Sequence, residues 1–193
     1  MVIEPSMPTG DAPCPHCGQL LWFDPVADSV CRFEFSTATP VDATITANRD
    51  AAKSFRKATA SLAQEDWPYA VEMFSRCAHL TPDNLLFRQT LRGVECRMYD
   101  NNGFGVRLPN SQLDRIRGQL EKAKSKQDWA TVDRLAEAGL RLRPWDTDLN
   151  LELGLASLAR GNRDVALFAL HCALNSSPDR DDIQAVIAKL EAN

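Results

Sequence analysis

Three cysteines near the start of the chain have the spacing that best fits chemistry. Cys14 and Cys17 lie in the sequence CPHCG, and Cys31 follows in VCRFEF. A two-residue interval lets both thiolates of a turn point at one metal ion, and Gly18 permits the left-handed backbone that closes such a turn. Cys14, Cys17 and Cys31 are therefore candidate zinc ligands.

The CPHCG turn resembles one half of a zinc ribbon, in which a strand, here residues 20–23, leaves the turn. In VCRFEF the apolar and charged side chains alternate, which predicts a second strand. The resemblance implies a small β-hairpin head over residues 14–35. A complete ribbon has two such turns, and structural zinc almost always takes four protein ligands, whereas this segment supplies three.

Several alternatives for the head therefore stay open. The fourth ligand comes from elsewhere in the chain or from a second copy, the heads of a homodimer share one zinc ion, or the hairpin binds no metal. A thiol redox role is disfavoured, because in thioredoxin-like proteins the motif begins a helix next to a strand, whereas Pro15 and Gly18 favour a turn.

The rest of the chain contains a repeated spacing of residues that predicts pairs of helices. Gly154, Ala166, Leu170 and Pro178 are separated by 12, 4 and 8 residues. Small residues at such positions let two helices cross closely, and the proline ends the second helix. The same intervals separate Ala58, Ala70, Phe74 and Pro82, and again Leu120, Val132, Ala136 and Pro144.

These repeats resemble tetratricopeptide repeats, whose period of 34 residues separates Pro144 from Pro178. The resemblance implies a mainly α fold, namely a right-handed helical-repeat solenoid of about eight helices over residues 50–193, preceded by the β-hairpin head. Residues 1–13 are expected to lack order, and the Ser-, Thr- and Ala-rich residues 36–49 to form a linker. The expected parts of the array are helix pairs over 51–82, 113–144 and 147–178, an extra helix over 84–99, a loop over 100–110 and a capping helix over 180–192.

Composition limits the function classes. The 193 residues include 44% hydrophobic and 25% charged residues, and the net charge of −4 argues against general affinity for nucleic acid or anionic membranes. No apolar run is long enough to span a membrane, and the first residues lack the basic start and apolar core of a secretory signal. We therefore expect a cytoplasmic protein.

The sequence shows neither paired carboxylates nor a nucleophile with its base, so we expect no enzymatic activity. In tetratricopeptide arrays the first helix of each pair lines a concave groove that holds a partner segment. In the helix pair over 147–178, the groove positions are Leu151, Leu155 and Leu158. These leucines are either buried under the capping helix or present an apolar patch to a partner. The resemblance implies these groove residues: Phe55, Thr59, Leu62, Gln89, Arg117, Glu121, Lys124, Leu151, Leu155 and Leu158.

The middle of the chain is basic, since residues 85–126 carry nine Lys or Arg against four Asp or Glu. Arg88 and Arg92 are four residues apart, as are Lys122 and Lys126, so each pair shares a helix face. Such a stripe is either an ordinary solvated face or a docking surface for an acidic partner. The candidate basic patch consists of Arg88, Arg92, Arg115, Lys122 and Lys126.

Together these features predict a scaffold or adaptor that binds a protein or peptide segment, with the basic middle favouring an acidic one. Two alternatives remain. The first is a nucleic-acid-associated regulatory protein that uses the zinc-ribbon-like head, against which the overall acidity argues. The second is thiol redox or metal-dependent activity at Cys14 and Cys17.

Overall fold

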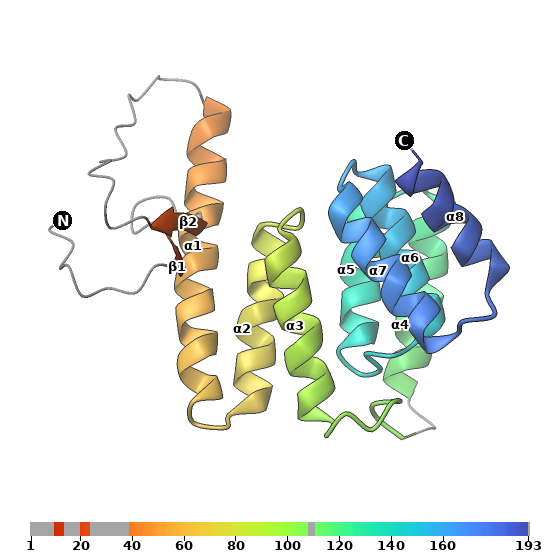
Figure 1. Cartoon of the computed structure of the whole chain (residues 1–193), viewed down its shortest axis with the longest axis horizontal. Helices are drawn as coiled ribbons and strands as arrows, with labels where there is room; N and C mark the ends of the chain where they lie inside the picture. The colour runs from red at the N-terminus through yellow and green to blue at the C-terminus, as the bar shows by residue number, and fades with distance from the viewer. Residues whose placement is uncertain (1–9, 14–19, 24–38, 108–110, 193) are drawn as a thin grey trace, which may run out of the picture.

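A computed structural model describes residues 10–13, 20–23, 39–107 and 111–192, with side chains from residue 44 onward. This part of the chain contains eight helices and two short strands (Figure 1). The expectation of a mainly α fold with about eight helices is confirmed. None of these helices is both long and apolar enough to cross a membrane.

The two strands lie near the N-terminus. β1 (Gly10–Pro13) pairs antiparallel with β2 (Leu20–Phe23), with Gly10 opposite Phe23. Residues 20–23 were expected to be a strand, whereas residues 10–13 were expected to lack order, and that expectation is wrong for these four. Cys14, Cys17, Cys31 and the expected second strand around Cys31 lie outside the described residues.

The first helix is longer than the repeat predicts. α1 (Thr39–Leu62) contains 24 residues, so residues 39–49 are helical and the expectation of a linker there is wrong. The segment has no glycine, and its one proline, Pro40, lies in the first turn, where a missing N–H is not needed for the helix. Ile45 and Ala47 are partly buried, which favours the helix over an exposed linker.

Four of the other seven helices, α2, α3, α5 and α6, follow a residue whose side chain caps the helix start. The side chains of Asp66, Asn84, Asp128 and Asp146 each accept a hydrogen bond from the backbone N–H three residues later. This bond satisfies one of the N–H groups that a helix start leaves without a partner. The helices are α2 (Trp67–Leu80), α3 (Leu85–Met98), α4 (Ser111–Ser125), α5 (Trp129–Leu140), α6 (Thr147–Ala159), α7 (Arg163–Ser176) and α8 (Asp181–Glu191).

Two of the interhelical turns repeat the same backbone conformation. Asp66 and Asp128 both have φ −81° and ψ 74°, and each precedes a tryptophan that begins a helix. The residues before them, Glu65 and Gln127, have positive φ values of 58° and 55°. The internal repeat that the sequence suggests is therefore present in the geometry of these turns.

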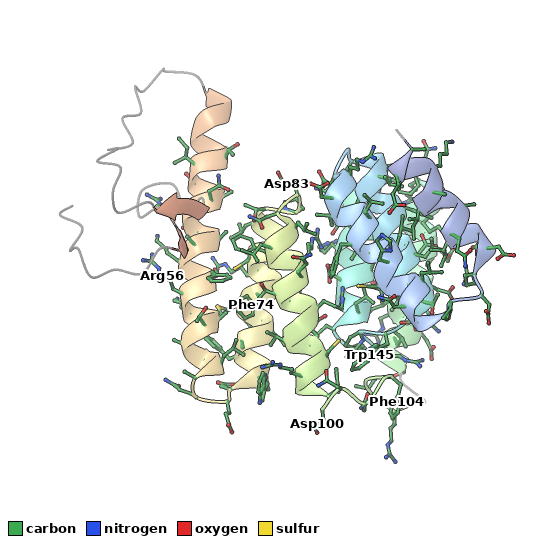
Figure 2. The ribbon with its side chains drawn as sticks, in the orientation of Figure 1. Arg56, Phe74, Asp83, Asp100, Phe104 and Trp145 are labelled. Atoms are coloured by element: carbon green, nitrogen blue, oxygen red, sulfur yellow. The ribbon has the colours of Figure 1, made fainter. Side chains whose placement is uncertain are left out.

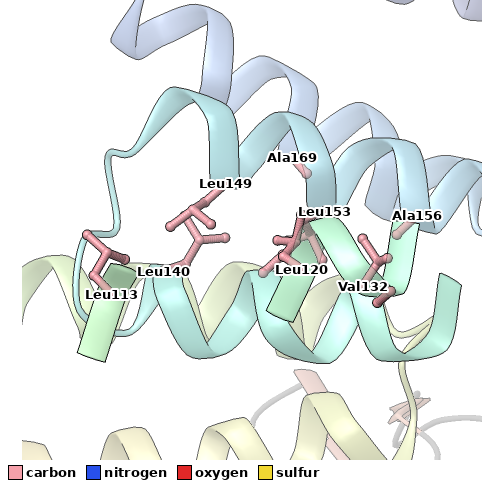
Figure 3. Packing of buried hydrophobic residues seen from close by; sticks show 10 residues of the cluster. Leu113, Leu120, Val132, Leu140, Leu149, Leu153, Ala156 and Ala169 are labelled. Atoms are coloured by element: carbon pink, nitrogen blue, oxygen red, sulfur yellow. The ribbon is translucent and has the colours of Figure 1, made fainter. Parts of the chain in front are cut away.

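The helices form two units. α1, α2 and α3 pack in succession to form an N-terminal unit, and α4 to α8 pack in succession to form a C-terminal unit (Figure 1). Each of the four apolar clusters among the described residues lies within one unit. Figure 3 shows the largest of them, where leucines of α4, α5 and α6 interdigitate.

The connection between the units is held by the end of α5. Gly105 has φ 85°, and a Cβ at this position would lie 2.2 Å from the carbonyl oxygen of Leu142. The N–H of Val106 donates to that oxygen at 2.9 Å, and the hydroxyl of Tyr99 donates to the carbonyl oxygen of Arg141 at 3.0 Å. These bonds place α3 beside the C-terminal unit, where it contacts α7.

Candidate functional site

An ionic network joins the two units. Arg88 of α3 is only 2% exposed. Its Nη2 donates to both carboxylate oxygens of Asp133 on α5, at 2.7 and 2.9 Å, and its Nη1 donates to Glu137 at 2.7 Å. Its Nε and Nη2 also donate to the carbonyl oxygen of Pro82. The guanidinium group is therefore fully used within the protein.

Arg92, one turn further along α3, extends this network. Its Nη2 donates to Glu137 at 3.0 Å, and its Nη1 donates to Glu95, which is completely buried. Burial raises the pKa of Glu95 to about 8, although Arg92 lowers it. Burial also raises the pKa of Glu137, but Arg92 and Arg88 outweigh this effect and hold that pKa below its ordinary value.

The network corrects the predicted basic patch. Arg88 and Arg92 share one face of α3, as the sequence indicates, but that face is buried against carboxylates of α5. They are thus not available to an acidic partner. Arg115, Lys122 and Lys126 of the predicted patch are exposed on α4 and the turn after it.

The predicted groove is also largely occupied by the protein itself. The Phe55 ring lies 5.4 Å from that of Phe74, which Figure 2 labels, and 5.5 Å from that of Phe87. Phe55 therefore belongs to the core between α1, α2 and α3. Leu62 packs beside this core. Leu151 and Leu158 pack against the cluster that includes Ile183 and Ile187 of α8, as expected if the capping helix buries them.

The polar residues of the predicted groove differ in their ion pairs and their exposure to solvent. Arg117 donates to Asp146 at 2.6 Å, and Lys124 pairs with Glu152 of α6. Their charges are therefore neutralised across the face where a partner was expected. The remaining groove residues are not brought together at one site: Thr59, Gln89 and Glu121 are exposed, and Leu155 is partly buried.

A hollow lined by described residues lies at the joint between the units. It has a volume of about 570 Å³, and its lining includes Arg88 and Asp133 of the ionic network. Its charged and histidine side chains are five arginines, two carboxylates and His79, which gives a formal charge of +3 with His79 neutral. We call this hollow the arginine cleft; its lining residues are Ser75, Arg76, Ala78, His79, Pro82, Arg88, Leu91, Gln112, Ala130, Asp133, Arg134, Glu137, Ala138, Arg141, Leu142 and Arg160.

The five arginines of the cleft fall into two groups. Arg88 and Arg160 pair with Asp133, where Arg160 Nη1 donates to Oδ2 at 2.7 Å. In contrast, none of the ion pairs found among the described residues involves Arg76, Arg134 or Arg141. These three unpaired arginines account for the net charge of the cleft.

Sequence analysis missed this cleft, although one signal pointed to it. Asp133 and Glu137 are four residues apart on α5, next to the buried Val132 and Ala136. Two carboxylates beside a buried apolar stripe require a cationic partner from another element. The sequence does not reveal that α3 and the end of α6 supply the arginines.

The described residues show no arrangement suited to catalysis by metal or thiolate. No three His, Cys, Asp or Glu side chains gather in a way that could hold a metal ion in the described ranges. Burial raises the pKa of Cys77 to about 12 and also raises the pKa values of Cys96 and Cys172. Since thiolates are the reactive form, these three cysteines are poor nucleophiles at neutral pH.

Two comparisons with known proteins, one with family models and one with curated sequences, give this chain no relative. No protein-family model matches it, and the search of curated proteins finds no match.

Proposed function

We propose that this protein is a non-enzymatic interaction scaffold that holds a segment of a partner protein in the arginine cleft. The observation that carries the proposal is the hollow of about 570 Å³ between two helical units, with three unpaired arginines in its lining. A hollow of this size is in the range of specific ligand sites. The proposed binding site thus lies at the joint between the units and not in the concave groove expected from the sequence.

The construction of the cleft is consistent with binding. Ala130, Arg134 and Ala138 follow one another at intervals of four residues on α5, so they share one helix face. The two alanines keep this wall low on both sides of Arg134. Arg76 and His79 of α2 line the cleft as well. The cleft therefore combines cationic side chains with small ones, which suits the binding of an extended segment.

The repeat architecture fits the same proposal. The turns at Asp66–Trp67 and Asp128–Trp129 share one geometry, as expected of tetratricopeptide-like repeats, which act as binding scaffolds.

We also propose that Cys14, Cys17 and Cys31 hold zinc in an N-terminal head. Cysteine thiolates suit this metal, and the fourth ligand would come from a second copy or another part of the chain.

Photo-crosslinking of the full-length protein tests the proposed site. A benzophenone amino acid is placed either at Ala138, which is exposed in the cleft, or at Gln119, which is exposed on α4 outside it. We expect a partner protein from the native host to crosslink at position 138 and not at position 119. Equal crosslinking at both positions, or crosslinking only at 119, would overturn the assignment of the cleft.

A further inference from the structure

The charges that line the arginine cleft are only partly balanced by ion pairs within the protein. At its floor, Asp133 and Glu137 receive hydrogen bonds from Arg88, and Asp133 also receives one from Arg160. The floor is therefore neutralised within the protein and offers a ligand neither a free anion nor a free cation. The other three arginines of the lining, Arg76, Arg134 and Arg141, belong to none of the ion pairs among the described residues.

These three arginines come from elements on two sides of the joint. Arg76 lies on α2 of the N-terminal unit, whereas Arg134 lies on α5 of the C-terminal unit and Arg141 caps its end. Arg134 and Arg141 are seven residues apart and so lie on the same side of the helix. A ligand in the cleft consequently meets cationic side chains from both units.

Unpaired like charges in a hollow produce a positive potential there, because its low-dielectric walls focus the field. The chain as a whole is acidic, with a net charge of −4, so the positive lining of the cleft is opposite in sign to the protein's overall charge. Guanidinium groups are planar and present several donors in a fork that matches carboxylate and phosphate oxygens. Among the described residues, no ion pair supplies an anionic partner to Arg76, Arg134 or Arg141.

We infer that the partner segment is acidic and that Arg76 and Arg134 bind its anionic side chains in the cleft. This inference rests on the proposed scaffold function and names the chemistry of the segment that the scaffold holds. The recognised group is a carboxylate or a phosphate on an extended peptide. Clustered Asp or Glu residues and a phosphorylated side chain are the two sources of that chemistry.

Three labelled peptides of equal length test this inference by fluorescence anisotropy with the full-length protein. One is a run of glutamates, one is a serine peptide that carries two phosphoserines, and the third is a run of glutamines. We expect the two anionic peptides to bind and the glutamine peptide not to bind. Tighter binding of the glutamate peptide would identify carboxylates as the source, and tighter binding of the phosphopeptide would identify phosphate.

A matched pair of double variants locates the binding. Arg76→Gln with Arg134→Gln removes two charges from the cleft, and Arg97→Gln with Arg115→Gln removes two charges from exposed positions outside it. We expect the cleft variant to weaken the binding of the anionic peptides by at least about tenfold, since charge-assisted hydrogen bonds are lost. The control should weaken it by no more than about twofold. Circular dichroism checks that both variants fold.

Each result bears on one of the two proposals. Equal loss in the two variants, or no binding of either anionic peptide to the wild-type protein, would overturn the acidic-segment inference. If the partner still crosslinks at position 138 in that case, the scaffold proposal stands. Binding of the anionic peptides without any crosslinked protein partner would instead contradict the scaffold proposal while leaving the cleft an anion site.

Discussion

Arg88 and Asp133 form a bidentate contact between two helical units across 45 residues of sequence, with Nη2 at 2.7 and 2.9 Å from the two carboxylate oxygens. Both side chains are nearly inaccessible to solvent. Because each apolar cluster of the described residues stays within one unit, this ionic contact is a principal link between α3 and α5. Ion pairs bridge the two units here, whereas none of these four apolar clusters does.

The first prediction concerns Arg88→Met. The change leaves Asp133 and Glu137 buried with one donor group fewer, and breaking a buried pair from one side typically costs about 3 to 5 kcal/mol. We expect the free energy of unfolding in urea to fall by about 3 kcal/mol, since Arg160 and Arg92 still bind these carboxylates. Arg115→Met, at an exposed position, should change it by less than about 0.5 kcal/mol. Similar values for the two variants would show that the joint does not depend on Arg88.

The second prediction concerns pH. Burial raises the pKa of Glu95 from an ordinary 4.5 to about 8, so the folded protein favours its protonated form. The stability from this group is fully present below about pH 4.5 and is lost as the pH rises through about 8. In Glu95→Gln this loss disappears. The free energy of unfolding, measured in urea at pH 5.5, 6.5 and 7.5, should therefore fall more with pH in the wild-type protein than in the variant.

An exposed carboxylate provides the control for this pH dependence. Glu121→Gln on α4 removes a carboxylate that is 70% exposed, so its profile should follow that of the wild-type protein. If the profiles of Glu95→Gln and of the wild-type protein were parallel, Glu95 would not titrate between these pH values in the folded state.

Helix positions could be predicted from sequence because their signals are local. The turns before Trp67 and Trp129 each contain an aspartate cap, and the prolines at 82, 144 and 178 follow the second helix of each pair. Such caps act within one turn of the chain. The helical residues 39–49 escaped this reasoning because their Thr- and Ala-rich sequence has no strong periodicity, and their helix is supported by packing.

The cleft could not be predicted because it depends on contacts between distant segments. The interval between Arg88 and Arg92 shows that they share a face, but not whether that face meets solvent or α5. Similarly, no local pattern shows that Lys124 pairs with Glu152, 28 residues later. The sequence therefore shows which side of a helix a charged residue lies on. Only the fold shows whether that residue pairs within the protein or faces solvent.

The third prediction uses two glycines in helices. A Cβ at Gly154 would lie 2.8 Å from Cγ of the buried Leu170, whereas a Cβ at Gly118 would meet nothing within 4 Å. We expect Gly154→Ala to lower the free energy of unfolding by about 1 to 2 kcal/mol through overpacking. Gly118→Ala should raise it by up to about 1 kcal/mol, because alanine favours the helix. Urea denaturation measures both, and stabilisation by Gly154→Ala would contradict the close crossing of α6 and α7.

The last prediction tests whether the basic residues of α4 serve the fold or a partner. Lys124 is 30% exposed and pairs with Glu152, which is 14% exposed, and one oxygen of Glu152 has no hydrogen-bond partner among the described residues. Lys124→Glu places two carboxylates together, so we expect the free energy of unfolding to fall by roughly 1 to 2 kcal/mol. The control Lys122→Glu, at an exposed position, should lower it by less than about 0.5 kcal/mol. Adding Glu152→Lys to Lys124→Glu restores an opposite-charge pair and should recover at least half of the loss. If all three variants matched the wild-type protein in urea denaturation, Lys124 would be free for a partner, and the groove predicted from the sequence would again be a candidate site.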